Sequence, residues 1–175
     1  MTPVGHSLVG AAVGVVVMPR YKSRLASSAF LCAFIAIANL PDWPLPGWGH
    51  SNYKISHSVF VNFALIVVIA SLLMLFKKAT RTIASWPVII GGAAAWLSHL
   101  LLDSFYNHGL GIAIFWPFSP ARLALPMPWF RTWSSVSPPL NADTFYICLV
   151  EALFYGPILL LAVVWRYWKG MRDKG

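Results

Sequence analysis

The chain has 175 residues, of which 58% are hydrophobic and 10% are charged, and its formal net charge is +8. This length allows one domain, residues 1–175, and a mean hydropathy of +0.68 excludes an ordinary soluble globular protein. A positive charge of this size can indicate nucleic-acid binding. Here the basic residues lie mainly in short turns between apolar runs, so we expect no nucleic-acid partner.

Five apolar runs follow one another along the chain. They predict an all-α integral membrane protein with about five transmembrane helices. The first run is the shortest and lies at the lower limit of length for a membrane span. The fourth contains a stretch of small residues, 91–95, that we expect to serve helix packing. The runs are Val4–Met18, Leu25–Leu40, Ser58–Phe76, Ile83–Leu102 and Phe145–Tyr167.

The basic residues occupy alternate connections between these runs. Ten of the thirteen follow the first, third and fifth runs, and the other three are Lys54, Arg122 and Arg131. Because cytoplasmic loops of membrane proteins carry the excess of Lys and Arg, the pattern predicts an N-terminus outside and a C-terminus in the cytoplasm. It also predicts contact between the basic loops and anionic lipid head groups.

The connection between the fourth and fifth runs, about residues 109–141, is rich in proline and tryptophan. It is too broken to form a span, and tryptophan is enriched at membrane–water interfaces. We therefore expect it to lie in the interface as short helices or loops. It serves there either as an aromatic belt or as a cover over a site.

All five histidines and two of the five acidic residues fall in three short stretches at predicted helix ends. The topology, derived from Lys and Arg alone, places the three stretches on the same, outer side of the membrane. His99 and Asp103 are four residues apart, so on a helix they project from one face. Because imidazole and carboxylate are ligands of zinc and its first-row neighbours, the pattern predicts a metal site at the extracytoplasmic face.

Each of these residues alone has a simpler interpretation. A single histidine such as His50 or His108 can be an interfacial side chain bonded to backbone or head groups, and Asp42 can be a turn or cap residue. Ionisable groups cost up to roughly 3 kcal/mol each at the centre of a bilayer, so several on one face indicate a function. Glu151, in the fifth run, is an extra ligand, a partner of a ligand or a buried structural acid.

Four motifs occur in a fixed order: Leu40-Pro41-Asp42, Ser56-His57-Ser58, Ser98-His99 through Asp103, and Trp116-Pro117-Phe118-Ser119. In this order and spacing they resemble the bacterial membrane-bound metal-dependent hydrolases of the YdjM-like family, over residues 1 to about 125. The resemblance implies a multi-pass protein of the bacterial inner membrane. It also implies a set of metal ligands, which are His6, Asp42, His57, His99 and Asp103.

The chain departs from the family pattern at two places. Pro44 stands where a second aspartate is usual, and Asn52-Tyr53 stand where the family usually has a His-Arg pair. Either His50 or Asn52 is expected to take the role of the missing histidine.

The same order of motifs has a more distant likeness to the superfamily of zinc-dependent phospholipases C and single-strand nucleases. The spacing of His99, Asp103 and His108 resembles the last motif of those enzymes, which cleave phosphodiesters. This likeness implies one to three zinc ions, or another divalent first-row metal.

We therefore expect a membrane-embedded hydrolase that cleaves a phosphoester of a phospholipid or lipid-linked substrate with metal-activated water. The candidates for general base and leaving-group acid are His50 and His108. The candidates for substrate binding are Asn52, Lys54 and Arg122. The alternatives are amide or peptide hydrolysis at the same site, and metal transport or sensing. A transporter should carry polar groups through the middle of several spans, whereas here those middles are nearly apolar.

Overall fold

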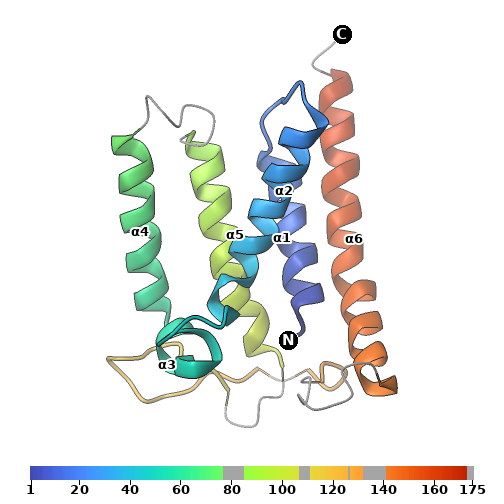
Figure 1. Cartoon of the computed structure of the whole chain (residues 1–175). Coiled ribbons are helices and arrows are strands. Elements are labelled where there is room, and N and C mark those ends of the chain that lie inside the picture. Colours follow the sequence, from blue (N-terminus) through green and yellow to red (C-terminus); the bar gives the residue numbers. More distant parts are fainter. Residues whose placement is uncertain (77–84, 107–110, 126, 132–140, 173–175) are drawn as a thin grey trace.

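The computed structural model describes residues 1–76, 85–106, 111–125, 127–131 and 141–172, with the backbone only for His50 and Ser51. Within these ranges the regular structure is helical, as expected, apart from one isolated antiparallel bridge between Ile112 and Leu123. In Figure 1 the long helices stand side by side, with α3 and the segments 111–125 and 127–131 at one end of them. The helices are α1 (Pro3–Val17), α2 (Arg24–Asn39), the 3-10 helices η1 (Leu40–Asp42) and η2 (Gly49–Asn52), α3 (Tyr53–Ser56), α4 (Val59–Leu75), α5 (Trp86–Ser104) and α6 (Ala142–Arg172).

Each predicted apolar run forms a helix whose ends lie within a few residues of the expected ones. Among the described residues, three helices are long and apolar enough to cross a membrane, namely α2 continued into η1, α5 and α6. The helices α1 and α4 are apolar but have only 15 and 17 residues. A hydrocarbon core requires roughly 20 residues. The structure therefore supports three spans and two shorter apolar helices, where the sequence predicts about five spans.

Local sequence sets the helix ends that matter for the site. The side chain of Thr2 caps α1 by accepting a hydrogen bond from the N–H of Val4, and Pro3 occupies a first-turn position that needs no N–H donor. Pro41 stands at the start of η1, where the α-helical ladder of α2 gives way to a single 3-10 turn. This turn carries Asp42, so the end of α2 positions a carboxylate.

The central helix is α1, which packs against α2, α5 and α6. Glycines allow the close approach, because a Cβ at Gly10 would lie 2.6 Å from that of Ala38 and a Cβ at Gly91 would lie 2.8 Å from a side chain of α1. The prediction that the stretch 91–95 serves packing is thus confirmed at Gly91. At Gly92, by contrast, a Cβ would meet nothing within 4 Å.

The helix α4 stands at the edge of the bundle, where it packs against α5 and α3 (Figure 1). It exposes large apolar side chains, among them Phe63, Val68 and Leu72. The same is true of α6, for example at Leu153 and Leu161. Exposed apolar surface of this kind suits contact with lipid chains.

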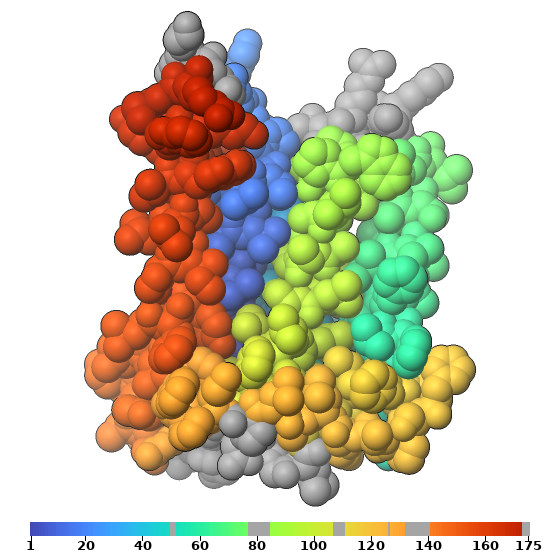
Figure 2. Space-filling model, turned by 180° about the vertical axis from the view of Figure 1, so that it is seen from behind, coloured from blue at the N-terminus to red at the C-terminus, as the bar shows by residue number. Residues whose placement is uncertain are grey.

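The described part of the Pro/Trp-rich connection runs across the ends of α4, α5 and α6 (Figure 2). Its backbone is held to two of these helices: the N–H of Leu125 donates to the carbonyl oxygen of Ser104 at 2.7 Å, and the N–H of Val59 donates to that of Ile114 at 2.9 Å. The segment consists of turns and the isolated bridge. Of the two expected forms, loops are therefore found in its described residues.

At the opposite end of the bundle, Arg166 of α6 fastens the end of α1. Its guanidinium donates to the carbonyl oxygens of Val15 at 2.8 Å, Met18 at 2.7 Å and Pro19 at 3.3 Å. Carbonyl groups at a helix C-terminus have no partner within the helix. The charge pattern assigns Arg166 only a role in topology, whereas the structure adds a C-terminal cap for α1.

Candidate metal centre

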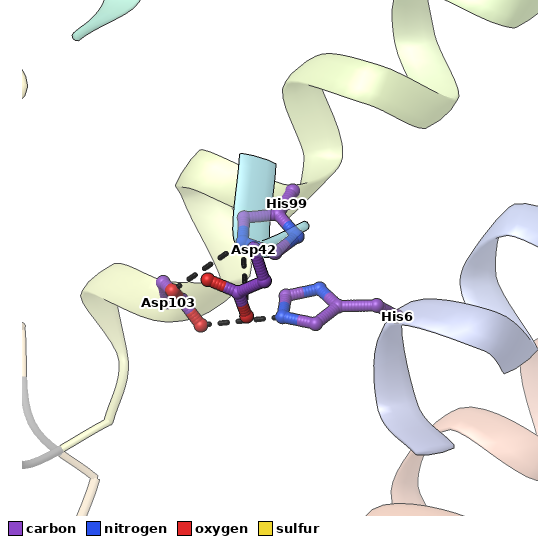
Figure 3. Close-up of side chains that lie close together, drawn as sticks. All are labelled: His6, Asp42, His99 and Asp103. Carbon is purple, nitrogen blue, oxygen red and sulfur yellow. Dashed lines mark ion pairs between the residues drawn. The ribbon is translucent and has the colours of Figure 1, made fainter. Parts of the chain in front are cut away.

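The three stretches of histidine and aspartate meet at one end of the bundle, as the sequence predicts. His6 comes from the first turns of α1, Asp42 from η1, His57 from the end of α3, and His99 and Asp103 from the last turns of α5. Figure 3 shows four of these side chains converging from three separate segments. Their donor atoms lie within 4.8 Å of one another; the four are His6, Asp42, His99 and Asp103.

Asp103 lies at the centre of the cluster, and its two oxygens face different imidazoles. Oδ2 lies 3.2 Å from Nε2 of His57 and 3.5 Å from Nε2 of His99, while Oδ1 lies 3.3 Å from Nε2 of His6. The predicted shared helix face of His99 and Asp103 is thus confirmed. The oxygens of Asp42 approach the same two rings, at 3.3 Å from Nε2 of His57 and 3.6 Å from Nε2 of His99.

Hydrogen bonds on the far side of two imidazoles decide which ring nitrogen faces the cluster. Nδ1 of His99 donates to the carbonyl oxygen of Ala38 at 2.8 Å. Oγ of Ser56 donates to the carbonyl oxygen of Gly49, so it accepts from Nδ1 of His57, 2.8 Å away. With both Nδ1 atoms protonated, the Nε2 atoms of the neutral rings carry lone pairs, and they face each other at 3.3 Å. Two acceptors cannot hydrogen-bond to each other, so the arrangement requires a cation between them, either a proton or a metal ion.

A tetrahedral metal ion fits these distances. Zinc binds nitrogen and carboxylate oxygen at about 2.0–2.2 Å, which places two ligands of a tetrahedron roughly 3.3 Å apart. Nε2 of His57, Nε2 of His99 and Oδ2 of Asp103 lie 3.2–3.5 Å from one another. Asp42 adds a fourth side chain, with Oδ1 at 3.3 Å from His57 and Oδ2 at 3.6 Å from His99. Nitrogen and carboxylate oxygen are also the donors that zinc and its first-row neighbours bind. The side chains present therefore fit such an ion.

His6 approaches the cluster from the other side. Its ring is fully buried and stacks on that of His99, with the centroids 3.7 Å apart. Within the described residues, neither ring nitrogen of His6 makes a hydrogen bond. Buried polar atoms of this kind are costly, so a ring nitrogen that faces a carboxylate oxygen of Asp103 suits ligation of a metal ion.

Glu151 stands outside this donor cluster but holds the backbone next to His6. It is buried in α6, and its carboxylate accepts hydrogen bonds from the N–H of Thr2 at 2.8 Å, from the N–H of Gly5 at 2.9 Å and from the hydroxyl of Thr2. N–H groups at the start of a helix have no partner within the helix. Of the roles that the sequence leaves open for Glu151, the structure supports a buried, hydrogen-bonded acid.

Two contacts at Asp103 are missed by sequence reasoning. The hydroxyl of Tyr53 donates to Oδ2 at 3.4 Å, and its ring stacks on His57 with the centroids 3.7 Å apart. The amino group of Met1 lies 3.2 Å from Oδ1. The sequence signal for Tyr53 is its spacing of four residues from His57, which brings two side chains together on one helical turn.

The carboxylates of Asp42 and Asp103 raise the pKa values of two groups in or next to α3, the His57 ring and the Tyr53 hydroxyl. Burial lowers the pKa of the His57 ring, but hydrogen bonds to Asp103 and Asp42 outweigh it and hold the pKa above the ordinary value. The pKa of the Tyr53 hydroxyl is raised, first by burial and then by the same two carboxylates. A proton on His57 thus satisfies the need for a cation when no metal ion is bound.

The cluster is most accessible at Asp42. The side chains of His6, His57 and His99 are 0% exposed and that of Asp103 is 2% exposed, whereas that of Asp42 is 23% exposed. Water or a substrate can therefore reach the centre beside η1. Buried charged groups require compensation, which a bound cation provides.

A family model described as YdjM inner membrane protein matches residues 1–172 of the chain. The chain belongs to this family. Together with its apolar helices, the match makes it an inner membrane protein. No curated protein and no solved structure matches the chain. The likeness to zinc-dependent phospholipases C and single-strand nucleases stays a prediction.

Three further predicted residues of this YdjM-family chain are described. Arg122 donates to the carbonyl oxygen of Gly111 at 3.2 Å, and its charge acts to lower the pKa of Tyr53, against the larger raising effects. It therefore lies near the centre. Lys54 is exposed on α3, and Asn52 is partly buried immediately before that helix. Their proposed roles in substrate binding stay predictions.

The two predicted acid–base residues cannot be placed in the same way. His108 lies outside the described residues. His50 belongs to η2, which precedes α3, and its side chain lies outside the described atoms. Their catalytic roles in the YdjM-family chain stay predictions.

Proposed function

We propose that this chain is a membrane-embedded, metal-dependent hydrolase that cleaves a phosphoester of a phospholipid or lipid-linked substrate. Its centre binds one to three zinc ions or another divalent first-row metal. The observation that carries the proposal is the pair of facing imidazole nitrogens of His57 and His99, which lie with Oδ2 of Asp103 at the spacing of tetrahedral ligands and have the carboxylate of Asp42 beside them. We place the centre at the extracytoplasmic face, because the described basic segments 20–24 and 166–172 lie at the other end of the bundle.

Asp103 joins two halves of the proposed centre. Its Oδ2 belongs with His57, His99 and Asp42, and its Oδ1 belongs with His6. The first half offers four protein donors, and the second offers fewer, which leaves room there for water and substrate. A metal ion lowers the pKa of its bound water toward roughly 7 and polarises a phosphoryl oxygen.

In the proposed reaction, a water oxygen adds to phosphorus and the P–O bond to the leaving alcohol breaks. The water loses one proton and the leaving oxygen gains one, so a base and an acid are needed. His50 and His108 are the candidates for these two roles. Arg122, with Lys54 and Asn52, is the candidate to hold the phosphate, since its positive charge acts on Tyr53, which donates to Asp103.

The position of the centre supports a lipid substrate. It lies at the end of α2 and α5, both long enough to cross a membrane. The segments 111–125 and 127–131, with Phe115, Phe118 and Trp129 exposed, lie across the same end. Aromatic side chains of this kind mark the depth of the lipid head groups, which is where lipid phosphates are found.

Two alternatives use the same residues. Amide or peptide hydrolysis requires the same activated water, so a substrate test separates it from phosphoester hydrolysis. Transport is less well supported, because a transport path needs such groups along the middle of the spans. Among the described residues, every buried histidine, aspartate and glutamate lies at the end that carries the cluster: His6, His57, His99, Asp103 and Glu151.

Metal content of the detergent-purified protein tests the proposal first. We expect one to three zinc ions per chain in the wild type. The variants His99→Ala and Asp103→Asn should weaken binding by more than the roughly 10–100-fold that loss of an outer partner costs. Asp143→Asn is the matched control, because this carboxylate is 77% exposed and pairs only at 3.9 Å with Arg131 among the described contacts. Thermal unfolding and helix content show whether each variant is folded.

Turnover then identifies the reaction. The zinc-loaded wild type is incubated with phosphatidylglycerol in mixed micelles, with a 4-nitrophenyl phosphodiester and with a set of peptide amides. Release of phosphoester products by the wild type and the Asp143→Asn control, and its loss in Asp103→Asn, is the expected result. A protein that binds no zinc after zinc is offered, or that cleaves only amides, overturns the phosphoester hydrolase.

A further inference from the structure

An apolar cavity of about 250 Å³ lies between α2, α4 and α5. Its walls are made of aliphatic and aromatic side chains and contain almost no polar surface. It is a different space from the centre, and the two share only η1 and α5 among the elements that line them. Its lining includes Phe34 and Ile37 from α2, Ile69 and Leu73 from α4, and Gly92 and Trp96 from α5.

The cavity exists because α5 is thin on this side. Gly91 packs closely against α1, whereas a Cβ at the neighbouring Gly92 would meet nothing within 4 Å. On the opposite wall, Ile69 of α4 is 42% exposed. The cavity therefore opens toward the surrounding hydrocarbon, from which an apolar molecule can enter sideways.

One end of the cavity adjoins the metal centre. Leu40, a lining residue, stands in the same 3-10 turn as Asp42. Trp96, another lining residue, precedes His99 by three positions on α5, so the two lie about one helical turn apart. An elongated molecule in the cavity thus ends beside two of the candidate ligands.

Trp96 forms the boundary between the apolar and the polar region. Its ring lines the cavity, while its Nε1 donates to Oδ1 of Asn62 at 2.6 Å. Nδ2 of Asn62 in turn donates to the carbonyl oxygens of Ser56 at 2.8 Å and Ser58 at 2.7 Å, the residues on either side of His57. The single polar atom of the indole is therefore used on the side of the centre.

We propose that this cavity binds one hydrocarbon chain of the lipid substrate and so places the phosphoester at the metal centre. The inference rests on the proposed function and adds the substrate feature that the centre alone does not specify. An engineered cavity of about 150 Å³ accommodates benzene, with six carbons, so a cavity of about 250 Å³ holds on the order of ten carbons. The lining of α5 from Val88 to Trp96 extends over about 12 Å, which suits an extended chain rather than a bulky head group.

The expected effect is selection among substrates rather than a gain in membrane affinity. A chain that leaves the bilayer for the cavity exchanges one apolar environment for another. For a monomeric substrate dissolved in water, kcat/KM should rise by up to roughly fourfold for each methylene that the cavity buries, which corresponds to about 0.8 kcal/mol. Chain-length dependence on monomeric substrates therefore reports the cavity.

The test uses n-alkyl 4-nitrophenyl phosphates from methyl to dodecyl, below their micellar concentrations, with zinc-loaded protein in amphipol. For the wild type, kcat/KM should rise with chain length and level off near ten carbons. Gly92→Leu fills the cavity and should lower the octyl-to-methyl ratio of kcat/KM at least tenfold. Gly156→Leu is the matched control, because a Cβ at Gly156 of α6 also meets nothing within 4 Å and this residue does not line the cavity; it should keep the wild-type ratio.

Ala70→Leu, on the α4 wall, provides a second filling variant if Gly92→Leu does not fold. Turnover of the whole series without dependence on chain length, or an equal fall of the ratio in the control, overturns the chain-binding cavity and leaves the hydrolase intact. No turnover of any member, including the methyl ester, overturns the hydrolase and the substrate chain with it. Photolabelling in nanodiscs by phosphatidylglycerol with a diazirine in one chain gives a readout without turnover. Label on α2, α4 and α5 that Gly92→Leu removes supports the cavity, and label that it leaves unchanged overturns it.

Discussion

Replacing Glu151 should weaken zinc binding even though its side chain lies outside the donor cluster. The carboxylate accepts three hydrogen bonds from the first turn of α1, two from Thr2 and one from Gly5, and it is 1% exposed. His6, which follows Gly5 directly in α1, is a candidate metal ligand. In Glu151→Ala the buried N–H groups lose their acceptor, so the start of α1 should detach from α6 and carry His6 away from Asp103.

The size of the effect follows from these contacts. A hydrogen bond to a charged group contributes about 1.5–3 kcal/mol, and removal of one side of a buried charged contact costs about 3–5 kcal/mol. Fraying of the first turn relieves part of this cost, so about 3 kcal/mol of unfolding free energy is the expected loss. Zinc affinity should fall roughly 10–100-fold, the range for removal of a group that orients a ligand. Glu151→Gln keeps one acceptor oxygen and should lie between wild type and alanine.

Competition between the purified protein and a chromogenic chelator measures zinc affinity, and thermal unfolding measures stability. The decisive comparison is made in the His6→Ala background. If Glu151 acts through His6, Glu151→Ala should lower the stability again in that background but should not weaken zinc binding any further. An equal loss of zinc affinity in both backgrounds would refute the reasoning.

The contacts of Arg166, the pKa of His57 and the packing of Gly10 can each be tested in the same way. Arg166→Ala should lower the unfolding free energy by about 1–3 kcal/mol, because carbonyl groups at the end of α1 lose a charged donor. Zinc affinity, measured on the same variant, should not change. A fall of zinc affinity would contradict a role of Arg166 confined to the end of the bundle opposite the metal centre. Zinc binding should release a proton and should tighten as pH rises from 6 to 8, because the raised pKa of His57 keeps a proton there that the metal must displace. Calorimetry in buffers of different ionisation enthalpy measures the released proton. A zinc affinity that does not depend on pH would count against His57 as a ligand. Gly10→Ala should lower the melting temperature by several degrees, because the new Cβ would lie 2.6 Å from that of Ala38. Gly156→Ala should leave the melting temperature unchanged, because a Cβ there meets nothing within 4 Å. Equal effects of the two variants would show that close packing of α1 on α2 does not limit stability.

Much of the fold could be predicted because hydropathy and charge are local signals. Each apolar run became a helix, since twenty or so apolar residues without charges have few alternatives in a membrane. The number of spans could not be predicted in the same way, because α1 and α4 fall short of full span length and the position of such helices depends on packing.

The cluster could also be predicted, because three independent stretches had to converge if the charge bias was right. His99 and Asp103 needed only the period of a helix. The supporting contacts could not be predicted. The use of Glu151 to hold the start of α1 depends on the packing of the first helix against the last, and nothing in either segment alone indicates it. The stacking of Tyr53 on His57 could have been predicted from their spacing of four residues. A tyrosine before a membrane helix, however, is ordinarily interpreted as an interfacial side chain.

The five candidate ligands belong to four separate segments: the start of α1, η1, the end of α3 and the end of α5. During biosynthesis α1, α2 and α4 are therefore made before α5, which carries His99 and Asp103, the last two residues of the proposed centre. Until α5 is made, the proposed topology leaves three candidate ligands without His99 and Asp103 at the outer leaflet, where other ions can bind them: His6, Asp42 and His57. In the proposed centre, a metal ion bound after α5 has been inserted would join these segments at one end of the bundle. Cells short of the metal should accordingly accumulate a chain that is fully inserted but open at this end, and an exposed His57 segment would make it a substrate for membrane proteases.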